Sequence, residues 1–211
     1  NIIANLLPSH AQTISVPNLH FGGYHPFYAR NPNWAKTKCD EHEHGLFPYG
    51  NRLIQDNIKY FTKLSSIAMN HLLKVSKYYP DEFLQNHFKK SLRFIKYKES
   101  ECNVKISDLI VDNFNSQWLF YTPDHPSRFV MQHVCDQIFA RLRLPKSELP
   151  ENLDWFANHQ LPIQPCVSKF FNLKFITPET QYRYDALSGF FNYDEYWTKY
   201  LMTAYPEMVA L

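Results

Sequence analysis

Glycine is scarce in this sequence, with only 5 glycines among 211 residues. Neither of the common phosphate-binding loops, GxGxxG or GxxxxGK followed by Ser or Thr, occurs in the chain. Both loops use glycine to bring backbone amides close to a phosphate group. Because these loops are absent, any anion site in this protein must be local and must be built in another way.

The chain also lacks a strong net charge, paired cysteines and long apolar runs. Lys and Arg number 22 and Asp and Glu 20, so the formal charge of +2 gives no argument for nucleic acid as a partner. The four cysteines form no CxxC pair, which indicates free thiols of a reducing compartment. No apolar run approaches a membrane span, and no leader peptide is visible. We therefore expect no integral membrane segment and a cytoplasmic protein, with the inner face of the membrane as an alternative location.

Apolar and aromatic side chains, in contrast, are abundant: 45% of the residues are hydrophobic and 17% aromatic, enough for a sizeable core. The 3.6-residue repeat of apolar side chains predicts helices at 51–79, 81–98, 107–114 and 127–142 and from Asn192 or Asp194 onward. Residues 13–16 and 118–122 are predicted strands, and 166–176 a strand or an extended run. The expected fold is α/β: a helix-rich single domain with a small central sheet covered by helices.

The chain divides into two parts of this one domain. Residues 1–144 are expected to form a core that carries two motif loops, at 17–27 and 122–128. Residues 145–211 are expected to be a proline-rich wrapping segment followed by the C-terminal helix. Wrapping is favoured over a flexible linker because the prolines accompany large apolar side chains that would be costly to leave in water.

Residues 39–44 read Cys-Asp-Glu-His-Glu-His, six consecutive side chains that can bind a metal ion. Thiolate and imidazole ligands suit zinc. The spacing fits no standard structural site, however, and no second Cys/His pair follows at a matching offset. A solvated polar loop is therefore the favoured interpretation, and no metal is expected.

The turn after predicted strand 118–122 contains the pair Asp124-His125, followed by the start of a predicted helix. A titratable pair between a strand end and a helix N-terminus is an arrangement that α/β proteins use for chemistry. His125 can act as a general base near neutral pH. Adjacent side chains rarely point at each other, so Asp124 could instead accept hydrogen bonds from the amides that open the helix. A catalytic and a structural role both stay open.

The second candidate element is the loop that contains His20, Gly22, Gly23, Tyr24 and His25. The two imidazoles lie close to a predicted strand end, and glycine allows a ligand to approach backbone amides. Packed, hydrogen-bonded histidines are the common structural alternative. No Ser or Cys lies in a recognisable nucleophile elbow, so a hydrolase or transferase would lack its nucleophile within these residues.

Predicted helix 81–98 has one basic face. A solvated face is the favoured interpretation, and an anion-binding edge is the alternative. The side chains concerned are Lys89, Lys90, Arg93, Lys96 and Lys98.

Two blocks of the chain resemble motifs of one protein family. The first is 14–26, Ile-Ser-Val-Pro-Asn-Leu-His-Phe-Gly-Gly-Tyr-His-Pro, and the second is 106–110 together with 119–127. Their order and spacing, over roughly residues 1 to 144, are similar to those of the WcbI-type polysaccharide-biosynthesis proteins. The resemblance implies a coenzyme A-dependent acetyltransferase of capsular sugars. Acetyl-coenzyme A would be its co-substrate, and a sugar or glycan its acceptor.

The resemblance also implies roles for single residues. Catalysis would fall to His125 and His25. Binding of the coenzyme would fall to Ser127, Arg128, Gly22 and Gly23. Contact with the substrate would fall to His20, Tyr24 and Asp124.

The chain departs from the family pattern in ways that leave catalysis open. Family members begin with a strand and a Gly-Asn-Cys-Gln turn, which is absent here, so we expect a segment before Asn1 to supply it. Asp124 stands where the pattern has Asn, and Phe27 where it has Asp. A non-catalytic carbohydrate-binding or scaffold protein is one alternative, because the 14 Tyr, 17 Phe and 4 Trp offer faces that stack on sugars. An SGNH-like esterase is another.

Overall fold

The structure, a computed structural model, describes residues 8, 11–38, 45–58, 74 and 79–206. Its helices are α1 (Arg52–Asn57), α3 (Asp81–Glu99), α4 (Ser107–Asn113), α5 (Arg128–Leu142), α6 (Pro165–Phe171) and α7 (Tyr193–Ala204). Short 3-10 turns lie at η2 (Trp34–Thr37), η5 (Trp155–Asn158) and η6 (Asp185–Leu187). The antiparallel strand pairs are β1 (Tyr28–Arg30) with β2 (Tyr49–Asn51), β3 (Phe120–Thr122) with β4 (His125–Pro126), and β5 (Tyr182–Tyr184) with β6 (Gly189–Phe191).

The helix-rich α/β class predicted from the sequence is confirmed. The strands of the described part form three separate two-stranded sheets in place of one central sheet. Each strand is at most three residues long, too short to pair on both of its edges with several neighbours. Each two-stranded sheet is therefore a local contact between neighbouring segments of the chain.

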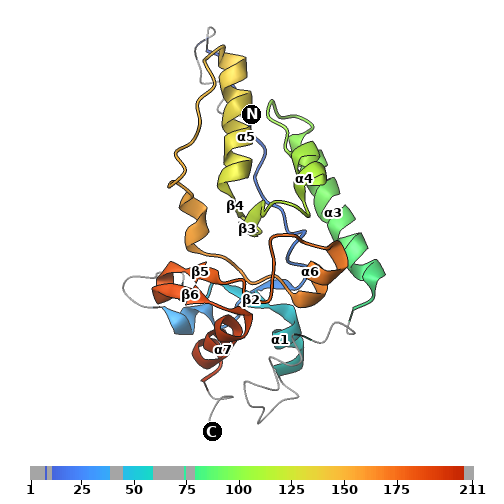
Figure 1. Cartoon of the computed structure of the whole chain (residues 1–211), viewed down its shortest axis with the longest axis vertical. Coiled ribbons are helices and arrows are strands. Elements are labelled where there is room, and N and C mark those ends of the chain that lie inside the picture. Colours follow the sequence, from blue (N-terminus) through green and yellow to red (C-terminus); the bar gives the residue numbers. More distant parts are fainter. Residues whose placement is uncertain (1–7, 9–10, 39–44, 59–73, 75–78, 207–211) are drawn as a thin grey trace.

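The elements are arranged in an elongated molecule (Figure 1). In its upper half, α3 and α4 lie on one side and α5 on the other, and the chain before β1 runs down between them. The lower end contains α1, α7 and the sheets β1–β2 and β5–β6. The segment after α5 descends beside that helix and leads into η5 and α6.

The predicted helices at 81–98, 107–114 and 127–142 are confirmed as α3, α4 and α5. The predicted last helix is α7, and Asn192 is its N-cap. The Asn192 side chain accepts from the Glu195 backbone N at 3.0 Å, and the Glu195 carboxylate accepts from the Asn192 backbone N at 2.9 Å. This capping box fixes the start of the helix.

Three other predictions have different outcomes. The predicted helix 51–79 begins as α1, capped by Asn51, but 59–73 and 75–78 lie outside the described residues, as does the metal-capable segment 39–44. No cluster of metal-binding side chains occurs in the described part of the chain. The predicted strand 13–16 is wrong. Within this run, Ser15 makes the hydrogen bonds to the loop after α3: its backbone O accepts from the backbone N of Asn103 and of Val104, and its backbone N donates to the Asn103 side chain. No strand is formed at 13–16.

The extended run predicted at 166–176 is also wrong, because most of it is helix α6. Pro165 occupies the first turn of this helix, where its fixed φ favours helical backbone and its missing N–H costs nothing. Asn172 ends the helix in a left-handed conformation. The apolar residues of this stretch therefore face the core from a helix.

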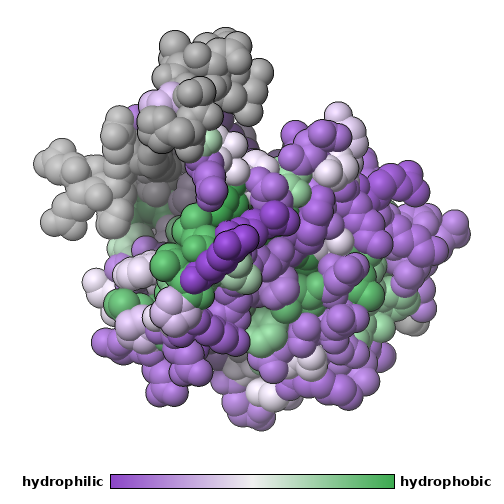
Figure 2. Space-filling view, turned by 90° about the horizontal axis from the view of Figure 1, so that it is seen from above, coloured by the Kyte–Doolittle hydropathy of each residue, from purple (hydrophilic) through white to green (hydrophobic). Residues whose placement is uncertain are grey.

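The core is dominated by aromatic rings. The fully buried Phe21 ring contacts the rings of Tyr24, Phe88, Phe114 and Phe120. Core residues come from both predicted parts of the chain, although the division into these parts stays a prediction. Seen from above, polar side chains cover most of the surface around a band of apolar ones (Figure 2). None of the helices described is long and apolar enough for a membrane span.

Glu99, the last residue of α3, joins this helix to α4. Its buried carboxylate accepts from the backbone N of Ile106 at 2.7 Å and of Ser107 at 3.1 Å, and from the Ser107 hydroxyl. These amides open α4, so Glu99 supplies the negative group that a helix N-terminus favours. The hydrogen bonds that join the end of α3 to the start of α4 thus come from the Glu99 side chain.

We predict that Glu99→Ala lowers the free energy of unfolding by about 2–4 kcal/mol, because buried amides lose a charged acceptor. Urea denaturation followed by circular dichroism measures the change. Glu101→Ala, at an exposed neighbouring carboxylate, is the control and should stay within about 0.5 kcal/mol of wild type. Equal midpoints for Glu99→Ala and wild type would show that the carboxylate does not hold α4.

Candidate functional site

The two motif loops meet at one place in the structure. The backbone N of Phe21 donates to the backbone O of Pro123 at 2.8 Å. Beside this bond, His20 Nδ1 lies 2.5 Å from Asp124 Oδ1. The adjacent pair Asp124-His125 is thus not a dyad. The carboxylate pairs with a histidine of the other loop, and the helix-capping role considered for Asp124 is wrong.

The first loop is anchored in the core by Phe21 and Tyr24. The Tyr24 ring stacks on Phe114 with a centroid distance of 4.4 Å, and its hydroxyl donates to the Phe114 backbone O at 2.7 Å. A Cβ at Gly23 would lie 2.3 Å from the Phe21 ring, so only glycine fits there. Gly23 therefore serves packing, and its φ is not in the left-handed region.

A cleft of about 600 Å³ lies between this loop and α3. Three contacts define its course: His20 with Phe94 at a ring-centroid distance of 6.2 Å, the Gly22 backbone O with His87 Nε2 at 2.9 Å, and Phe27 with Phe83 at 5.8 Å. The loop thus runs antiparallel to α3 along the cleft. Side chains that can titrate or carry charge line it: His20, His25, His87, Lys90 and Arg52.

The His20–Asp124 pair is the most polar part of this wall, and both side chains are partly exposed. The hydrogen bond to Asp124 raises the pKa of His20 above its usual value, against the opposing effect of burial. The same bond lowers the pKa of Asp124. Nδ1–H donation to the carboxylate leaves Nε2 of His20 as the ring nitrogen that can accept a proton. This arrangement suits a general base.

His25 is the buried member of the cleft lining. Burial lowers the pKa of His25 to about 3, so its imidazole is neutral near neutral pH. The ring hydrogen-bonds to the backbone of Tyr121, and Nε2 is buried without a hydrogen-bond partner in the described part of the chain. A neutral acceptor facing inward can orient a polar group but cannot carry positive charge.

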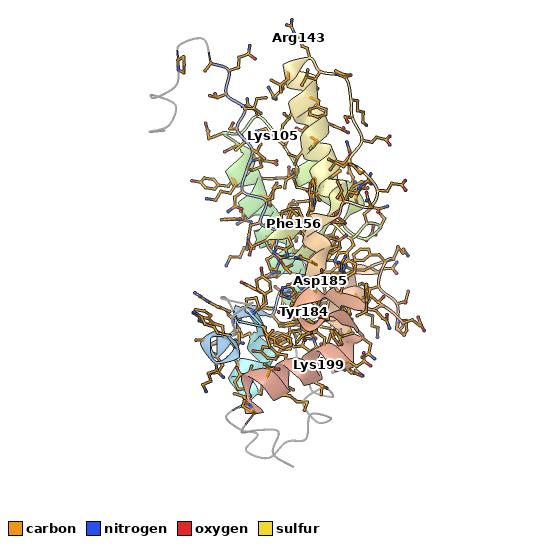
Figure 3. The ribbon with its side chains drawn as sticks, turned by 90° about the vertical axis from the view of Figure 1, so that its left-hand side faces the viewer. Lys105, Arg143, Phe156, Tyr184, Asp185 and Lys199 are labelled. Carbon is orange, nitrogen blue, oxygen red and sulfur yellow. The ribbon has the colours of Figure 1, made fainter. Side chains whose placement is uncertain are left out.

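His125 lies behind the cleft, among aromatic rings. It contacts Tyr49, His159 and Phe156, with centroid distances of 6.2, 6.1 and 5.6 Å. Phe156 lies at mid-height of the molecule, between Arg143 at one end and Lys199 at the other (Figure 3). Burial lowers the pKa of His125, and its ring hydrogen-bonds to the backbone of His159. The structure therefore places His125 near the meeting point of the loops but outside the cleft lining.

The residues predicted to bind the coenzyme are divided between different places. Gly22 lines the cleft, whereas Ser127 is buried at the start of α5, with its backbone N donating to the Leu119 backbone O. The Ser127 hydroxyl makes no capping bond. Arg128 donates to the backbone O atoms of Leu149 and Pro150 and so fastens the wrapping segment. Neither Ser127 nor Arg128 belongs to the described lining of the cleft.

Sequence reasoning missed the α3 wall of the cleft. His87, Ser91 and Phe94 carry no motif, and Arg52 looked like part of a long amphipathic helix. The available signal was the basic face of 81–98, from which Lys90 faces the cleft. All five side chains of that face are exposed, as the favoured interpretation of a solvated face expects, and the anion-binding edge stays a prediction.

The fold and the cleft define the class: a helix-rich α/β protein with a cation-lined cleft beside an imidazole–carboxylate pair. A similar solved structure is described as WcbI, a novel polysaccharide biosynthesis enzyme, in its native form without a disulfide bond between coenzyme A and a cysteine. The similarity has a TM-score of 0.69 at 18% identity, covers 97% of this chain, and shows a shared fold. The chain spans 64% of that protein's chain.

Residues 1–147 match the family model described as "Polysaccharide biosynthesis enzyme WcbI". The match covers more than half of the chain, and the chain belongs to this family. The resemblance seen in the two sequence blocks is thus confirmed. A search of curated proteins gives no match.

The neighbouring glycines provide a matched pair of substitutions. Gly23→Ala should lower the free energy of unfolding by about 1–3 kcal/mol or more, because the new methyl group overlaps the immobile Phe21 ring. Gly22→Ala should be nearly neutral, since its methyl group would lie 3.8 Å from His87 and 3.9 Å from Ser91. Thermal unfolding of both variants measures the difference. Equal losses in the two variants would contradict the packing assigned to this loop.

The His20–Asp124 pair makes a prediction about titration. In the wild type, NMR should give His20 an apparent pKa above 6.5, and Asp124→Asn should lower it by removing the acceptor and its charge. By linkage, the stabilisation from this pair is present between the ordinary pKa of an Asp carboxyl and pH 6.5. It is lost as pH rises through the raised pKa of His20 and as pH falls through the lowered pKa of Asp124. An unchanged His20 titration in Asp124→Asn would contradict the pairing.

Proposed function

We propose that this protein is a coenzyme A-dependent acyltransferase, with acetyl as the transferred group, acting on a polysaccharide or sugar precursor of surface-glycan biosynthesis. The observation that carries the proposal is the His20–Asp124 pair at the wall of a cleft that also contains Lys90 and Arg52. Membership of a polysaccharide biosynthesis family and the coenzyme A in the description of the similar structure support it.

The cleft residues fit an anionic, extended co-substrate. Lys90 and Arg52 are exposed, and no acidic partner for either occurs among the described residues. Free cations of this kind suit phosphate groups. Acetyl-coenzyme A would supply an acyl group activated as a thioester.

His20 is the residue best placed to act as the base. Its Nε2 would take the proton of an acceptor hydroxyl as that oxygen bonds to the acyl carbon, while Asp124 holds the ring tautomer and stabilises the imidazolium that forms. The thioester C–S bond would then break, and the imidazolium would return the proton to the leaving thiolate of coenzyme A. A sugar hydroxyl would itself be the nucleophile in this scheme, so no cysteine or serine of the described chain is needed. The elevated pKa of His20 matches a base that must be regenerated near neutral pH.

The other two histidines have supporting roles in this proposal. His25, neutral and buried at the cleft, would orient a polar group through its unpartnered Nε2. His125 would shape the acceptor side with Tyr49 and Phe156, whose faces suit a sugar ring. The catalytic role expected for His125 from the family resemblance stays a prediction that the same experiment tests.

The proposal is tested by calorimetry with acetyl-coenzyme A and by thiol release in the presence of capsular oligosaccharides. The wild type should bind and turn over. His20→Asn should reduce turnover by about 100-fold or more while its affinity for acetyl-coenzyme A stays within a few-fold. Asp124→Asn should lose turnover and shift the acidic limb of the pH profile to lower pH, because the pKa of His20 falls.

Two further variants complete the design. His133→Asn, at a histidine bonded to the backbone of Lys105, should leave binding and turnover unchanged. His125→Ala with unchanged affinity and turnover would remove His125 from the site. Binding of oligosaccharide without any acetyl-coenzyme A binding would favour a non-catalytic carbohydrate-binding protein and overturn the proposal.

A further inference from the structure

The cleft has two unlike ends, which allows the orientation of its ligand to be assigned. We infer that Lys90 and Arg52 bind the phosphates of coenzyme A near Phe83, with the pantetheine arm running past Gly22 to His20. This inference rests on the proposed function and adds the direction of binding and the residues that hold the phosphates. It assigns the phosphates to the cleft lining in place of Ser127 and Arg128, which the family resemblance implied and which lie outside that lining.

The length of the cleft follows from α3. The contacts His20–Phe94 and Phe27–Phe83 mark positions at opposite ends of the cleft. From residue 83 to residue 94, at about 1.5 Å of rise per residue, the helix covers about 16 Å. A ligand that fills the cleft must therefore be extended, with one end near Phe83 and the other end near Phe94.

The two cations of the described cleft lining, Arg52 and Lys90, are placed toward the Phe83 end. A third cation, Lys98, is not part of that lining and lies with its Nζ 5.3 Å from the centroid of the Phe94 ring. The backbone N of Arg52 donates to the Phe27 backbone O at 2.8 Å, which fixes Arg52 beside the Phe27–Phe83 contact. Lys90 belongs to the middle of the α3 wall, but side chains on a helix lean toward its N-terminus, here toward Phe83. Burial is the main cause that lowers the pKa of His87, and the charge of Lys90 adds to this effect, in keeping with the place of both residues in the cleft lining.

The Phe94 end has a different chemistry. His20 and its partner Asp124 lie there, and a carboxylate would repel a phosphate group. An uncharged arm can pass this pair, and His20 can accept a proton there. Between the two ends, Gly22 has no side chain, and a Cβ would still leave 3.8 Å to His87, so the middle of the cleft stays open.

The alternative phosphate site at the start of α5 is disfavoured by its own hydrogen bonds. Arg128 is held by two hydrogen bonds, from Nε to the backbone O of Pro150 and from Nη2 to the backbone O of Leu149, which use two of its five N–H donors. Ser127 is buried, and its backbone N is bonded to Leu119. If the Arg128 guanidinium turned toward a phosphate at this position, it would lose its hydrogen bonds to Leu149 and Pro150.

Calorimetry with the full chain tests the phosphate-binding residues. Lys90→Ala and Arg52→Ala should each lower the affinity for coenzyme A about tenfold, as expected for the loss of one charge-assisted contact. Both should leave the affinity for pantetheine, which has no nucleotide, unchanged. Lys96→Ala is the matched control. Lys96 is exposed on the same helix, six residues after Lys90, and its side chain points about 120° around the helix axis from that of Lys90. The Lys96→Ala variant should bind coenzyme A as the wild type does.

The direction is tested with coenzyme A disulfide, which exchanges with a protein thiolate to form a mixed disulfide and release one coenzyme A thiol. Phe94→Cys should be modified faster than Phe83→Cys, with rates measured by peptide mass spectrometry. Glutathione disulfide, which lacks the nucleotide, corrects for the exposure of each cysteine. Faster modification of Phe83→Cys than of Phe94→Cys would overturn the inference. Wild-type affinity for coenzyme A in both Lys90→Ala and Arg52→Ala would also overturn it. Absence of coenzyme A binding by the wild type would overturn the proposed function itself.

Discussion

The backbone hydrogen bond between Phe21 and Pro123 is the constraint on which the site depends. It joins two loops that are about a hundred residues apart in the chain, and the buried Phe21 ring makes it rigid. Without this bond, His20 and Asp124 would be two solvated side chains on separate loops. A partly exposed ion pair contributes little stability by itself, so the pair is a consequence of the core packing and not its cause.

The same constraint separates the histidines into two groups. Burial keeps His25 and His159 neutral, because each pKa is lowered to about 3. His20 is partly exposed and paired with a carboxylate, which raises its pKa. Where the two loops meet, burial thus keeps His25 and His159 as neutral polar groups, and His20 is the histidine that changes charge near neutral pH.

Sequence reasoning found both loops but not how they join. Helices with a clear apolar repeat, such as α3 and α5, and the capped α7 were predictable because local periodicity and capping dictate them. The pairing of His20 with Asp124 was not predictable, because it depends on a tertiary hydrogen bond that leaves no local signal. Tyr24 illustrates the same limit: the family resemblance implied a contact with substrate, and the structure stacks its buried ring on Phe114 in the core.

The scarcity of glycine bears on how the proposed anion site would be built. A glycine-rich loop binds phosphate through backbone amides, and this chain has no such loop. Of its five glycines, Gly23 is used to admit the Phe21 ring and Gly22 to keep the cleft open beside His87. The positive charge must then come from side chains, and Lys90 and Arg52 provide it from two different helices. Binding through lysine and arginine depends on ionic strength, so affinity for an anionic ligand in this cleft should fall as salt is added.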